Sequence, residues 1–280
     1  MDERPEPHEL RQGPFTVTSL THDLRALGLD AGATVLVHSS LSALGYVVGG
    51  ARAVVMALDA VLGPRGTLVV PTHSAELSDP SHWINPPIPD AWWAVVRESM
   101  PAYDPELTAT RKMGAVTDVV RHLPGFVRSA HPRVSFGAVG PHAEFITGAH
   151  ELRNGFDEHS PLARLYDLEA SILLLGVGHH NNTSLHLGEG RAPARRRVIT
   201  QGAPMMVEGQ RRWVTYESLD YDDNDFEQVG AAIAAAGLER SGRVGASLSR
   251  YMDVVPVVDF AVTWFTQHRT WPRSWPQERG

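Results

Sequence analysis

Apolar residues along the chain fall either into short unbroken runs or into segments with helical spacing. Three runs, Thr34–Val37, Thr67–Val70 and Ile172–Leu175, predict strands that are buried on both faces of a sheet. A helix over Ala51–Leu62, closed by Gly63-Pro64, separates the first two runs. Because strand, helix and strand follow one another through short turns, they predict a βαβ unit and a parallel pairing.

The remaining elements follow from the same patterns. Short antiparallel strands over Val198–Thr200 and Arg212–Glu217 predict a hairpin around Glu208-Gly209, and a further strand is expected near Gly245–Ser249. Further helices are predicted over Thr18–Leu29, Ala115–Leu123, Pro141–Ile146, Leu162–Tyr166, an alanine-rich segment ending at Ala236, and Val254–His268. We therefore predict an α/β fold with a mixed, largely parallel central sheet, helices on both faces and a C-terminal antiparallel hairpin. One domain over 15–270 is expected, between a disordered tail, 1–14, and a C-terminal tail, 271–280.

The stretch SILLLGVGHHNNTSLHLGE, residues 171–189, is the centre of this organisation. The apolar strand ends in a glycine turn, after which Asn181 or Asn182 is placed to cap a helix that contains His186 and Glu189. Ligands in such sheets lie beyond the carboxyl ends of the strands, so a histidine on this helix is placed to move protons. A packed core or surface histidine is the alternative reading of the same pattern.

Composition narrows the classes of function. The 280 residues carry a formal net charge of −7 and a pI near 6.0, which argues against general nucleic-acid binding and suits a cationic small substrate. Cysteine is absent, so the chain has no disulfide, no thiolate nucleophile and no cysteine-ligated metal. The charged N-terminus lacks a secretory signal, and no apolar run reaches the ~18 residues of a membrane span. We expect a cytoplasmic protein without nucleic-acid or membrane partners.

Several motifs are incomplete or ambiguous. A Walker loop is absent, and Gly176-Val177-Gly178 lacks the third glycine of a dinucleotide fingerprint. His179, His180, His186 and Glu189 match no zinc spacing, so no metal site is predicted.

Two loops are candidates for binding. The aperiodic, proline-rich segment from Ser78 to Pro89 reads as a substrate wall or lid, with tryptophans that line it or pin it down. Arg111 and Lys112 lie just ahead of a predicted helix, where they form either a phosphate-binding site or a solvent-exposed basic turn.

Six blocks of sequence carry a resemblance to a known family. They are VLVHSSLSALG (35–45), GTLVVPTH (66–73), MPAYDPELTATRKMGAV (100–116), RSAHPRVSFGAVGPHA (128–143), HSPLARL (159–165) and LLLGVGHHNNTSLHLGE (173–189). In this order they resemble the antibiotic N-acetyltransferase family, the aminoglycoside 3-N-acetyltransferases and their relatives. The resemblance implies an acyltransferase that uses acetyl-CoA as cosubstrate, without a metal, and acetylates an amine of an aminoglycoside. A homodimer is left open.

The resemblance also implies the catalytic residues. His186 matches the histidine of an HLxE motif and would be the general base. The carboxylate that orients it would come from the segment after the hairpin, with Asp220 favoured over Glu217, whereas Glu189 is expected to be structural.

Binding residues are carried over in the same way. Ser39, Ser40 and Leu41 match the loop that holds the pantetheine and pyrophosphate of CoA. Further positions around the CoA groove are Thr72, Arg111, Met113, Gly114, His131 and Ser135. The acids expected to receive a cationic sugar are Glu76, Asp79, Asp222 and Asp223.

Chemistry then favours a direct transfer, in which a neutral imidazole removes a proton from the amine before nitrogen attacks the thioester. An acyl-enzyme is disfavoured because cysteine is absent and no serine is evidently paired with a base. Three functions remain open: acetylation of the 3-amino group of an aminoglycoside; acetylation of another amine, such as the 2′-amino group of kasugamycin; and a CoA-binding protein without turnover or a metal-dependent hydrolase.

Overall fold

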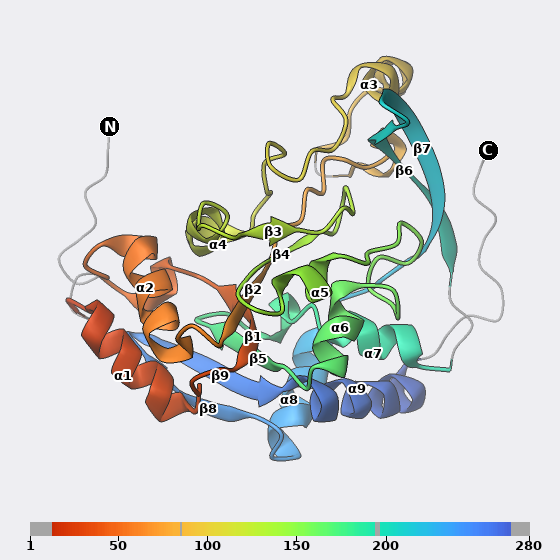
Figure 1. The fold of residues 1–280 in the computed structure, drawn as a ribbon. Helices are drawn as coiled ribbons and strands as arrows, with labels where there is room; N and C mark the ends of the chain where they lie inside the picture. Colours follow the sequence, from red (N-terminus) through yellow and green to blue (C-terminus); the bar gives the residue numbers. More distant parts are fainter. Residues whose placement is uncertain (1–12, 85, 194–196, 270–280) are drawn as a thin grey trace.

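The computed structural model describes residues 13–84, 86–193 and 197–269, so almost all of both expected tails lies outside the described residues. A seven-stranded sheet with the strand order β3-β4-β2-β1-β5-β9-β8 forms the centre of the molecule (Figure 1). Its strands are β1 (Thr34–Ser39), β2 (Thr67–Pro71), β3 (Val127–Arg128), β4 (Phe136–Val139), β5 (Ser171–Leu175), β8 (Arg240–Val244) and β9 (Ser247–Asp253).

Parallel pairing is confined to the middle of this sheet. β1 pairs in parallel with β2 on one side and β5 on the other, whereas the four outer pairings are antiparallel. The mixed α/β fold is confirmed, but the expectation of a largely parallel sheet is wrong. The outer strands β3 and β4, and β8 and β9, are joined by short connections, which allow only antiparallel neighbours.

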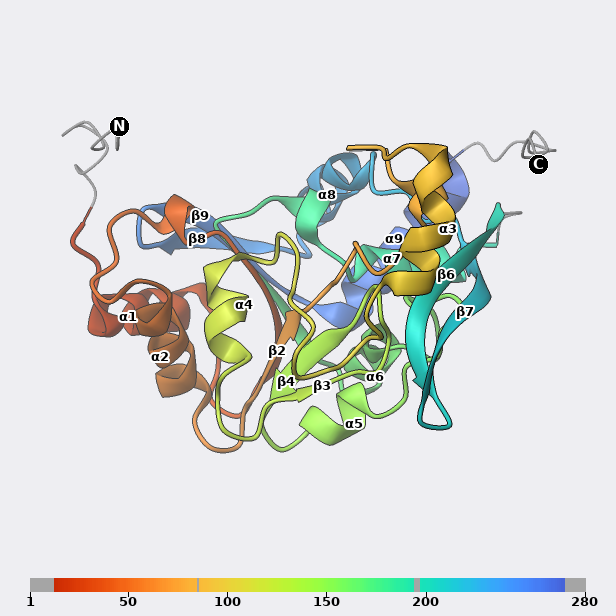
Figure 2. The same ribbon diagram turned by 90° about the horizontal axis from the view of Figure 1, so that it is seen from above.

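Helices cover both faces of the sheet, as Figures 1 and 2 show. The bounds of the helices are α1 (Val17–Leu27), α2 (Gly50–Leu62), α3 (Trp93–Ser99), α4 (Gly114–Val120), α5 (Ala143–Thr147), α6 (Pro161–Asp167), α7 (Leu185–Arg191), α8 (Phe226–Ala235) and α9 (Val254–His268). Four short 3-10 helices are η1 (Ser42–Leu44), η2 (Pro80–His82), η3 (Asp90–Trp92) and η4 (His179–Asn181). Among the described residues, no helix combines the length and apolarity needed to cross a bilayer.

Alternating residues of the central strands belong to two separate hydrophobic cores. Val37 and Leu173 belong to the core under α1, α2 and α4, whereas Leu36, Ile172 and Leu174 belong to the core under α5 to α9. Successive side chains of a strand point to opposite faces, so a strand between two helical layers must be apolar at every position. This arrangement explains why these segments read as unbroken apolar runs.

The predicted hairpin is longer than expected and does not join the sheet. β6 (Val198–Val207) and β7 (Gln210–Leu219) pair along their full ten-residue lengths as a separate ribbon. Figures 1 and 2 both show this ribbon on the side of the molecule away from α1 and α2. Arg211 ties it to the segment with α3, donating to the carbonyl of Met100 at 3.0 Å and to that of Arg97.

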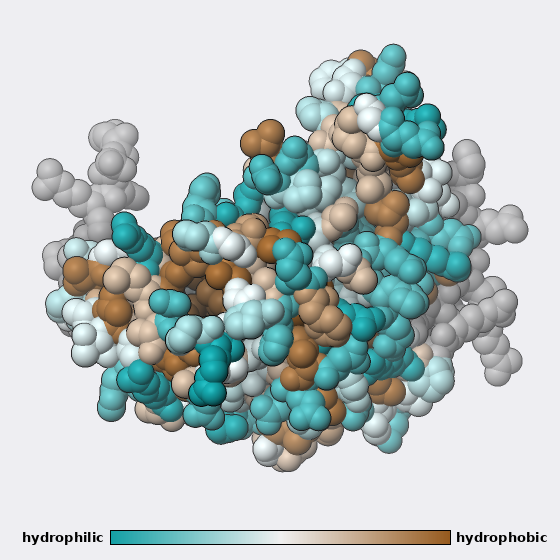
Figure 3. Space-filling model, in the orientation of Figure 1, coloured by the Kyte–Doolittle hydropathy of each residue, from teal (hydrophilic) through white to brown (hydrophobic). Residues whose placement is uncertain are grey.

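The first part of the proline-rich loop, residues 78–83, is held by local hydrogen bonds. Asp79 caps η2 through Ser81, and the indole N–H of Trp83 donates to Ser78 Oγ at 3.0 Å. Trp92, in contrast, is 57% exposed on η3. On the face drawn in Figure 3, apolar side chains gather in the region of α2 and α4, where Met56 of α2 is 50% exposed.

Candidate active site

The carboxyl ends of the three central strands converge on one pocket. His38 lies near the end of β1, His73 follows β2 by two residues, and Gly176 follows β5 with a φ of 72°. A side chain at Gly176 would place its Cβ 2.9 Å from Ala43 Cβ, so the turn requires glycine. This convergence is the place where open α/β sheets bind ligands.

The helix α7 delivers His186 to this pocket. The predicted asparagine cap is wrong: the helix begins after Ser184, which makes no capping bond, because η4 occupies 179–181. Asn182 is instead fully buried, with its amide 3.4 Å from His179 Nδ1. α7 lies so close to α9 that a Cβ at Gly188 would stand 2.7 Å from Ala261 Cβ. The histidine is therefore carried by a rigidly packed turn of helix.

His186 and Glu189 form a hydrogen-bonded pair on one side of α7. The distance from His186 Nδ1 to Glu189 Oε2 is 2.8 Å, and the side chains are 13% and 0% exposed. Because a carboxylate can only accept, the proton must lie on Nδ1, and Nε2 of the neutral ring keeps its lone pair. Nε2 makes no hydrogen bond within the described part of the chain, and the ring lines the pocket.

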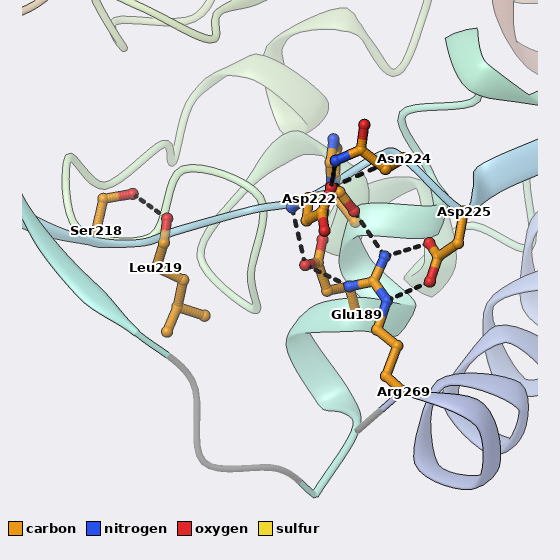
Figure 4. A network of polar contacts seen from close by, with 8 residues as sticks. Glu189, Ser218, Leu219, Asp222, Asn224, Asp225 and Arg269 are labelled. Atoms are coloured by element: carbon orange, nitrogen blue, oxygen red, sulfur yellow. Dashed lines mark hydrogen bonds and ion pairs between the residues drawn. The ribbon is translucent and has the colours of Figure 1, made fainter. Parts of the chain in front are cut away.

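The second carboxylate oxygen of Glu189 also accepts hydrogen bonds. Glu189 Oε1 accepts a hydrogen bond from the backbone N–H of Asp222 at 3.1 Å and one from Arg269 Nη1 at 2.7 Å. Arg269 also bonds both oxygens of Asp225 and the carbonyl of Asp222, which Figure 4 shows as one network. The charge of Glu189 is therefore paired and its geometry is fixed.

This geometry corrects the expectation about the orienting carboxylate. Asp220 pairs with Arg197 at 3.5 Å and Glu217 with Arg153 at 3.2 Å, and all four side chains are 34% exposed or more. Neither acid contacts His186. The segment after the hairpin reaches the site through the backbone of Asp222 instead, and the residue expected to be structural supplies the carboxylate.

Aromatic rings surround His186. Phe156 stacks on the imidazole with a centroid distance of 4.7 Å and an interplanar angle of 12°. Phe226 and Tyr221 lie against it at 4.7 and 5.3 Å. These contacts fix the plane of the imidazole ring.

The pocket has a volume of about 290 Å³, at the lower end of small-molecule sites. Residues from strand ends, loops and helices that are far apart in sequence form its walls. They are His38, Pro71, His73, Ala75, Met113, Arg133, Val134, Phe156, His180, Asn181, Thr183, His186, Asp223 and Phe226.

Part of the expected CoA-binding set lies together beside this pocket. Gly114, with a φ of 82°, begins α4 so close to the β1 loop that a Cβ there would stand 3.4 Å from the carbonyl of Ser39. Arg111 donates its backbone N–H to the carbonyl of His73 at 2.8 Å, and its side chain is exposed. Met113 lines the pocket itself. Ser40 and Leu41 follow Ser39 on the same loop, directly before η1.

Three other residues of that set are interior. Thr72, Ser135 and His131 are at most 2% exposed, so their side chains offer almost no surface to a CoA groove. Thr72 and Ser135 hold Arg128, whose Nε donates to their hydroxyls at 3.2 and 3.0 Å. His131 Nδ1 accepts the backbone N–H groups of the two residues 133 and 134 and so shapes its own loop. Buried polar groups of this kind are satisfied within the protein.

The four acids proposed for a cationic sugar differ in availability. Asp79 is bonded by Arg97 at 2.7 and 3.0 Å through both carboxylate oxygens, whereas Asp222 is exposed and its Oδ1 accepts hydrogen bonds from Asn224. Asp223 lines the pocket. Glu76 follows the pocket residue Ala75, and its Oε2 is buried without a partner among the described residues.

The histidines near α7 do not gather around a common point. His179 pairs with Glu239 at 2.7 Å, His180 with Glu227 at 2.8 Å, and His186 with Glu189. No group of three or more potential metal ligands is found within the described ranges. Each of these histidines is thus oriented by its own carboxylate.

Sequence reasoning did not select His38, His73, Phe156 or Arg269 as site residues. A signal existed for the two histidines, because each lies within two residues of the carboxyl end of a buried parallel strand. Phe156 and Arg269 lie in irregular segments, where no pattern in the sequence indicates a contact with His186 or Glu189.

Buried neutral histidines should make the fold sensitive to acid. Burial lowers the pKa of His38 to about 3 and that of His150 to about 4, and it lowers those of His73 and His131 well below 6.5. Below pH 6.5 the unfolded chain therefore binds more protons than the folded chain. The free energy of unfolding should be highest above about pH 6.5 and should fall toward pH 4. His150 alone should account for a loss of roughly 3 kcal/mol over this range.

Urea unfolding between pH 7.5 and 4.5 measures this effect. A His150→Gln variant should show a shallower pH dependence, because glutamine can still bond Ser129 and Gly155, the two partners of His150, without titrating. An unfolding free energy that stays constant from pH 7 to pH 5 would contradict the prediction.

Comparison with known proteins places the chain in a family. The model of the family described as aminoglycoside 3-N-acetyltransferase matches residues 36–266. The chain belongs to the aminoglycoside 3-N-acetyltransferase family. Its members are acyltransferases, and the resemblance read from the sequence is thereby confirmed.

Individual relatives match over nearly the whole chain. The aminoglycoside N(3′)-acetyltransferase-like protein YokD of Bacillus subtilis is 46% identical over 253 residues, 90% of this chain and 93% of its own. Its crystal structure superposes with a TM-score of 0.89 over 91% of this chain and 95% of that one, at 45% identity. Aminoglycoside N(3)-acetyltransferase VII of Streptomyces paromomycinus is 38% identical, covering 91% of this chain and 93% of its own. The binary complex of AAC-IIIb with CoASH superposes with a TM-score of 0.81 at 30% identity, covering 92% of this chain and 99% of that one.

Proposed function

We propose that this protein transfers the acetyl group of acetyl-CoA to an amino group of an aminoglycoside, at the 3-amino position. The observation that carries the proposal is the His186–Glu189 pair, which presents an unprotonated ring nitrogen to a pocket at the carboxyl ends of the central strands. A ligand with an ammonium group meets an imidazole there, and removal of a proton by a positioned base is what N-acetylation of an amine needs.

In this proposal the bound ammonium first loses one proton to water through His186 Nε2, and the freed nitrogen attacks the thioester carbon. A C–N bond forms, His186 Nε2 takes a second proton from this nitrogen, and the C–S bond breaks as that proton passes to the leaving thiolate, which leaves a neutral amide and a neutral histidine. Glu189 keeps the proton of the neutral ring on Nδ1 and stabilises the imidazolium that forms. General base catalysis of this kind contributes roughly 10²–10⁴-fold to a rate.

The CoA seat is proposed along the loop of Ser39, Ser40 and Leu41 and the start of α4. The support is structural: Gly114 begins α4 next to the Ser39 carbonyl, and Met113 lines the pocket. The exposed guanidinium of Arg111 is placed to meet a phosphate near the mouth. A relative solved with CoASH is compatible with such a seat on this fold.

The acceptor seat is proposed on the side of Asp223 and Glu76. Asp223 lines the pocket, and Glu76 has an unpartnered buried oxygen among the described residues. Carboxylates there would bind the further ammonium groups of a sugar by charge-assisted hydrogen bonds. The relative from Streptomyces paromomycinus, named as an aminoglycoside N(3)-acetyltransferase, supports this class of acceptor.

The test is release of free thiol from acetyl-CoA on addition of kanamycin, gentamicin or kasugamycin, with mass spectrometry of the product. Thiol release with kanamycin or gentamicin and an acetyl group on the 3-amino nitrogen supports the proposal. Release with kasugamycin alone would move the acetylated amine to another position, and thiol release with none of the three would overturn the proposal.

A further inference from the structure

Two imidazoles besides that of His186 line the pocket and have no role in the reaction proposed above. His38 lies at the carboxyl end of β1, and His73 lies two residues beyond that of β2. The Nε2 atom of each ring is buried and has no hydrogen-bond partner among the described residues. Because a buried polar group without a partner destabilises the folded chain, such groups beside a pocket point to a ligand that satisfies them.

The ring of His38 is free to donate. Neither of its nitrogens forms a hydrogen bond within the described part of the chain, and the side chain is 5% exposed. Burial lowers the pKa of His38 to about 3, so the ring is neutral near pH 7. A neutral imidazole carries one N–H, and no protein contact fixes which nitrogen holds it. A ligand oxygen can therefore select the tautomer whose N–H faces the pocket.

The position of His38 in the chain places it at the reacting end of CoA. The loop 39–41, which is proposed to hold CoA, follows it directly. A thioester carried by this loop must reach the pocket of His186 for the transfer, and His38 is part of the wall of that pocket. The carbonyl of the thioester is thus the ligand oxygen that comes to this side of the pocket.

His73 is placed differently. Its ring contacts those of Phe136 and Phe156, with centroid distances of 5.3 and 5.7 Å. It is followed after two residues by Glu76, which is proposed to bind the acceptor. Of the two histidines, His38 is therefore the one on the side of the cosubstrate.

We propose that His38 donates a hydrogen bond to the carbonyl oxygen of the acetyl thioester and stabilises the oxyanion that forms when the amine attacks. The inference rests on the proposed acetyl transfer and adds a second catalytic residue to it. As the nitrogen lone pair forms the C–N bond, the π electrons of the C=O bond move to the oxygen, and they return when the C–S bond breaks. The N–H bond of His38 stays intact, so the proton transfers at His186 are unchanged.

A neutral donor suits a polycationic acceptor. A positively charged group at the thioester would repel the ammonium groups of an aminoglycoside, whereas a neutral imidazole supplies an N–H without a charge. A donor that is already in place where negative charge develops needs no reorganisation during the reaction. Neutral histidines with a lowered pKa polarise substrate carbonyls in this way in other enzymes.

The experiment observes the thioester carbonyl directly. Acetyl-CoA labelled with ¹³C at the carbonyl is bound to the native protein without an acceptor, and isotope-edited infrared spectroscopy gives its C=O stretching frequency. A hydrogen bond weakens the C=O bond, so the frequency should be lower in the native protein than in a His38→Leu variant. This readout needs no turnover and reports on the donor alone.

Kinetics of the variants test the catalytic contribution. His38→Leu should lower kcat by roughly 10²–10³-fold, the cost of removing one oxyanion donor, and should leave the KM for acetyl-CoA nearly unchanged. His38→Asn and His38→Gln place an amide N–H near the positions of Nδ1 and Nε2, respectively. One of these two variants should restore part of the rate and of the low carbonyl frequency, and it identifies the donating nitrogen.

His142→Leu is the matched control. His142 Nδ1 lies 2.9 Å from Thr34 Oγ1 at the amino end of β1, the opposite end of the strand from His38. This variant should keep the native carbonyl frequency and kcat. His38→Leu should be at least as stable in urea as the native protein, because leucine removes a buried polar group that has no partner.

Other results would overturn the inference. Loss of stability and of CoA affinity in His38→Leu, with no rescue by asparagine or glutamine, would make the histidine structural. A low carbonyl frequency that persists in His38→Leu would assign the oxyanion to another donor: to His73 or Arg133 if His73→Leu or Arg133→Gln abolishes it, and to backbone N–H groups if neither does.

Failure of the proposed function has a different signature. If the native protein lowers the carbonyl frequency and His38→Leu does not, but no aminoglycoside releases thiol, the proposed acceptor is wrong and the contact between His38 and the thioester stands. If the native protein does not bind acetyl-CoA at all, both proposals fail.

Discussion

His186→Asn is expected to lower kcat by roughly 10²–10⁴-fold, the range that general base catalysis contributes. The asparagine amide can take the place of Nδ1–H and donate to Glu189, whose carboxylate lies 2.8 Å from that nitrogen in the native protein. The substitution therefore removes the base and retains the bond to the carboxylate. The stopped-flow or steady-state release of thiol from acetyl-CoA measures the loss.

Binding of CoA should persist in this variant. The proposed CoA seat lies on the β1 loop and at the start of α4, and His186 contributes none of its hydrogen bonds there. Calorimetric affinity for CoA within about threefold of the native value is the expected result, since a change below ~0.7 kcal/mol is small for a lost contact. His22→Asn, an exposed histidine of α1, is the control and should keep full activity. Simultaneous loss of CoA affinity and turnover would mean that His186 is structural.

Glu189→Gln is expected to reduce kcat nearly as much, although the side chain hardly changes in shape. Three donors converge on the native carboxylate: His186 Nδ1–H, the backbone N–H of Asp222 and Arg269 Nη1–H. An amide cannot accept at both ends. If its NH₂ faces Asp222 and Arg269, donors oppose donors; if it faces His186, the ring must carry its proton on Nε2, which is the wrong tautomer for a base.

The kinetic loss should be roughly 10²-fold or more, because a base in the wrong tautomer loses most of its catalytic contribution. The same variant should be less stable by about 1–3 kcal/mol, the cost of buried donors without an acceptor, as measured by urea unfolding. Glu217→Gln and Asp220→Asn are matched controls on exposed pairs and should change neither quantity. A large loss in Asp220→Asn with an active Glu189→Gln would restore the expectation drawn from the sequence.

Network geometry explains why a residue outside the family motifs matters here. Arg269 follows the last helix, and it bonds Glu189, Asp225 and the carbonyl of Asp222. The carboxylate that orients the base is therefore tied to both the segment after the hairpin and the end of α9 (Figure 4). Small shifts of α9 would reach His186 through this network.

Local signals predicted the elements of this protein well. The periodicity of Val254–His268 gave the helix α9 with its observed bounds, and the apolar runs gave β1, β2 and β5 to within two residues at either end. The errors occurred in segments whose structure depends on contacts between residues that are far apart in the sequence. The turn at Gly245 separates β8 from β9, so the strand expected over Gly245–Ser249 begins at Ser247 and runs to Asp253, paired with β5.

The amino-acid sequence by itself determined the family, the buried central strands, and the histidine on the helix after the third of them, because these depend on local pattern and motif. It did not determine which carboxylate meets His186, since Glu189, Glu217 and Asp220 are equivalent as residue types. Only the tertiary structure decided this, by turning Glu189 inward beside Arg269 and leaving the other two acids exposed with arginines of their own. The physical reason is that hydrogen bonding requires a specific distance and direction, and residues far apart in the chain acquire these only when the helices pack.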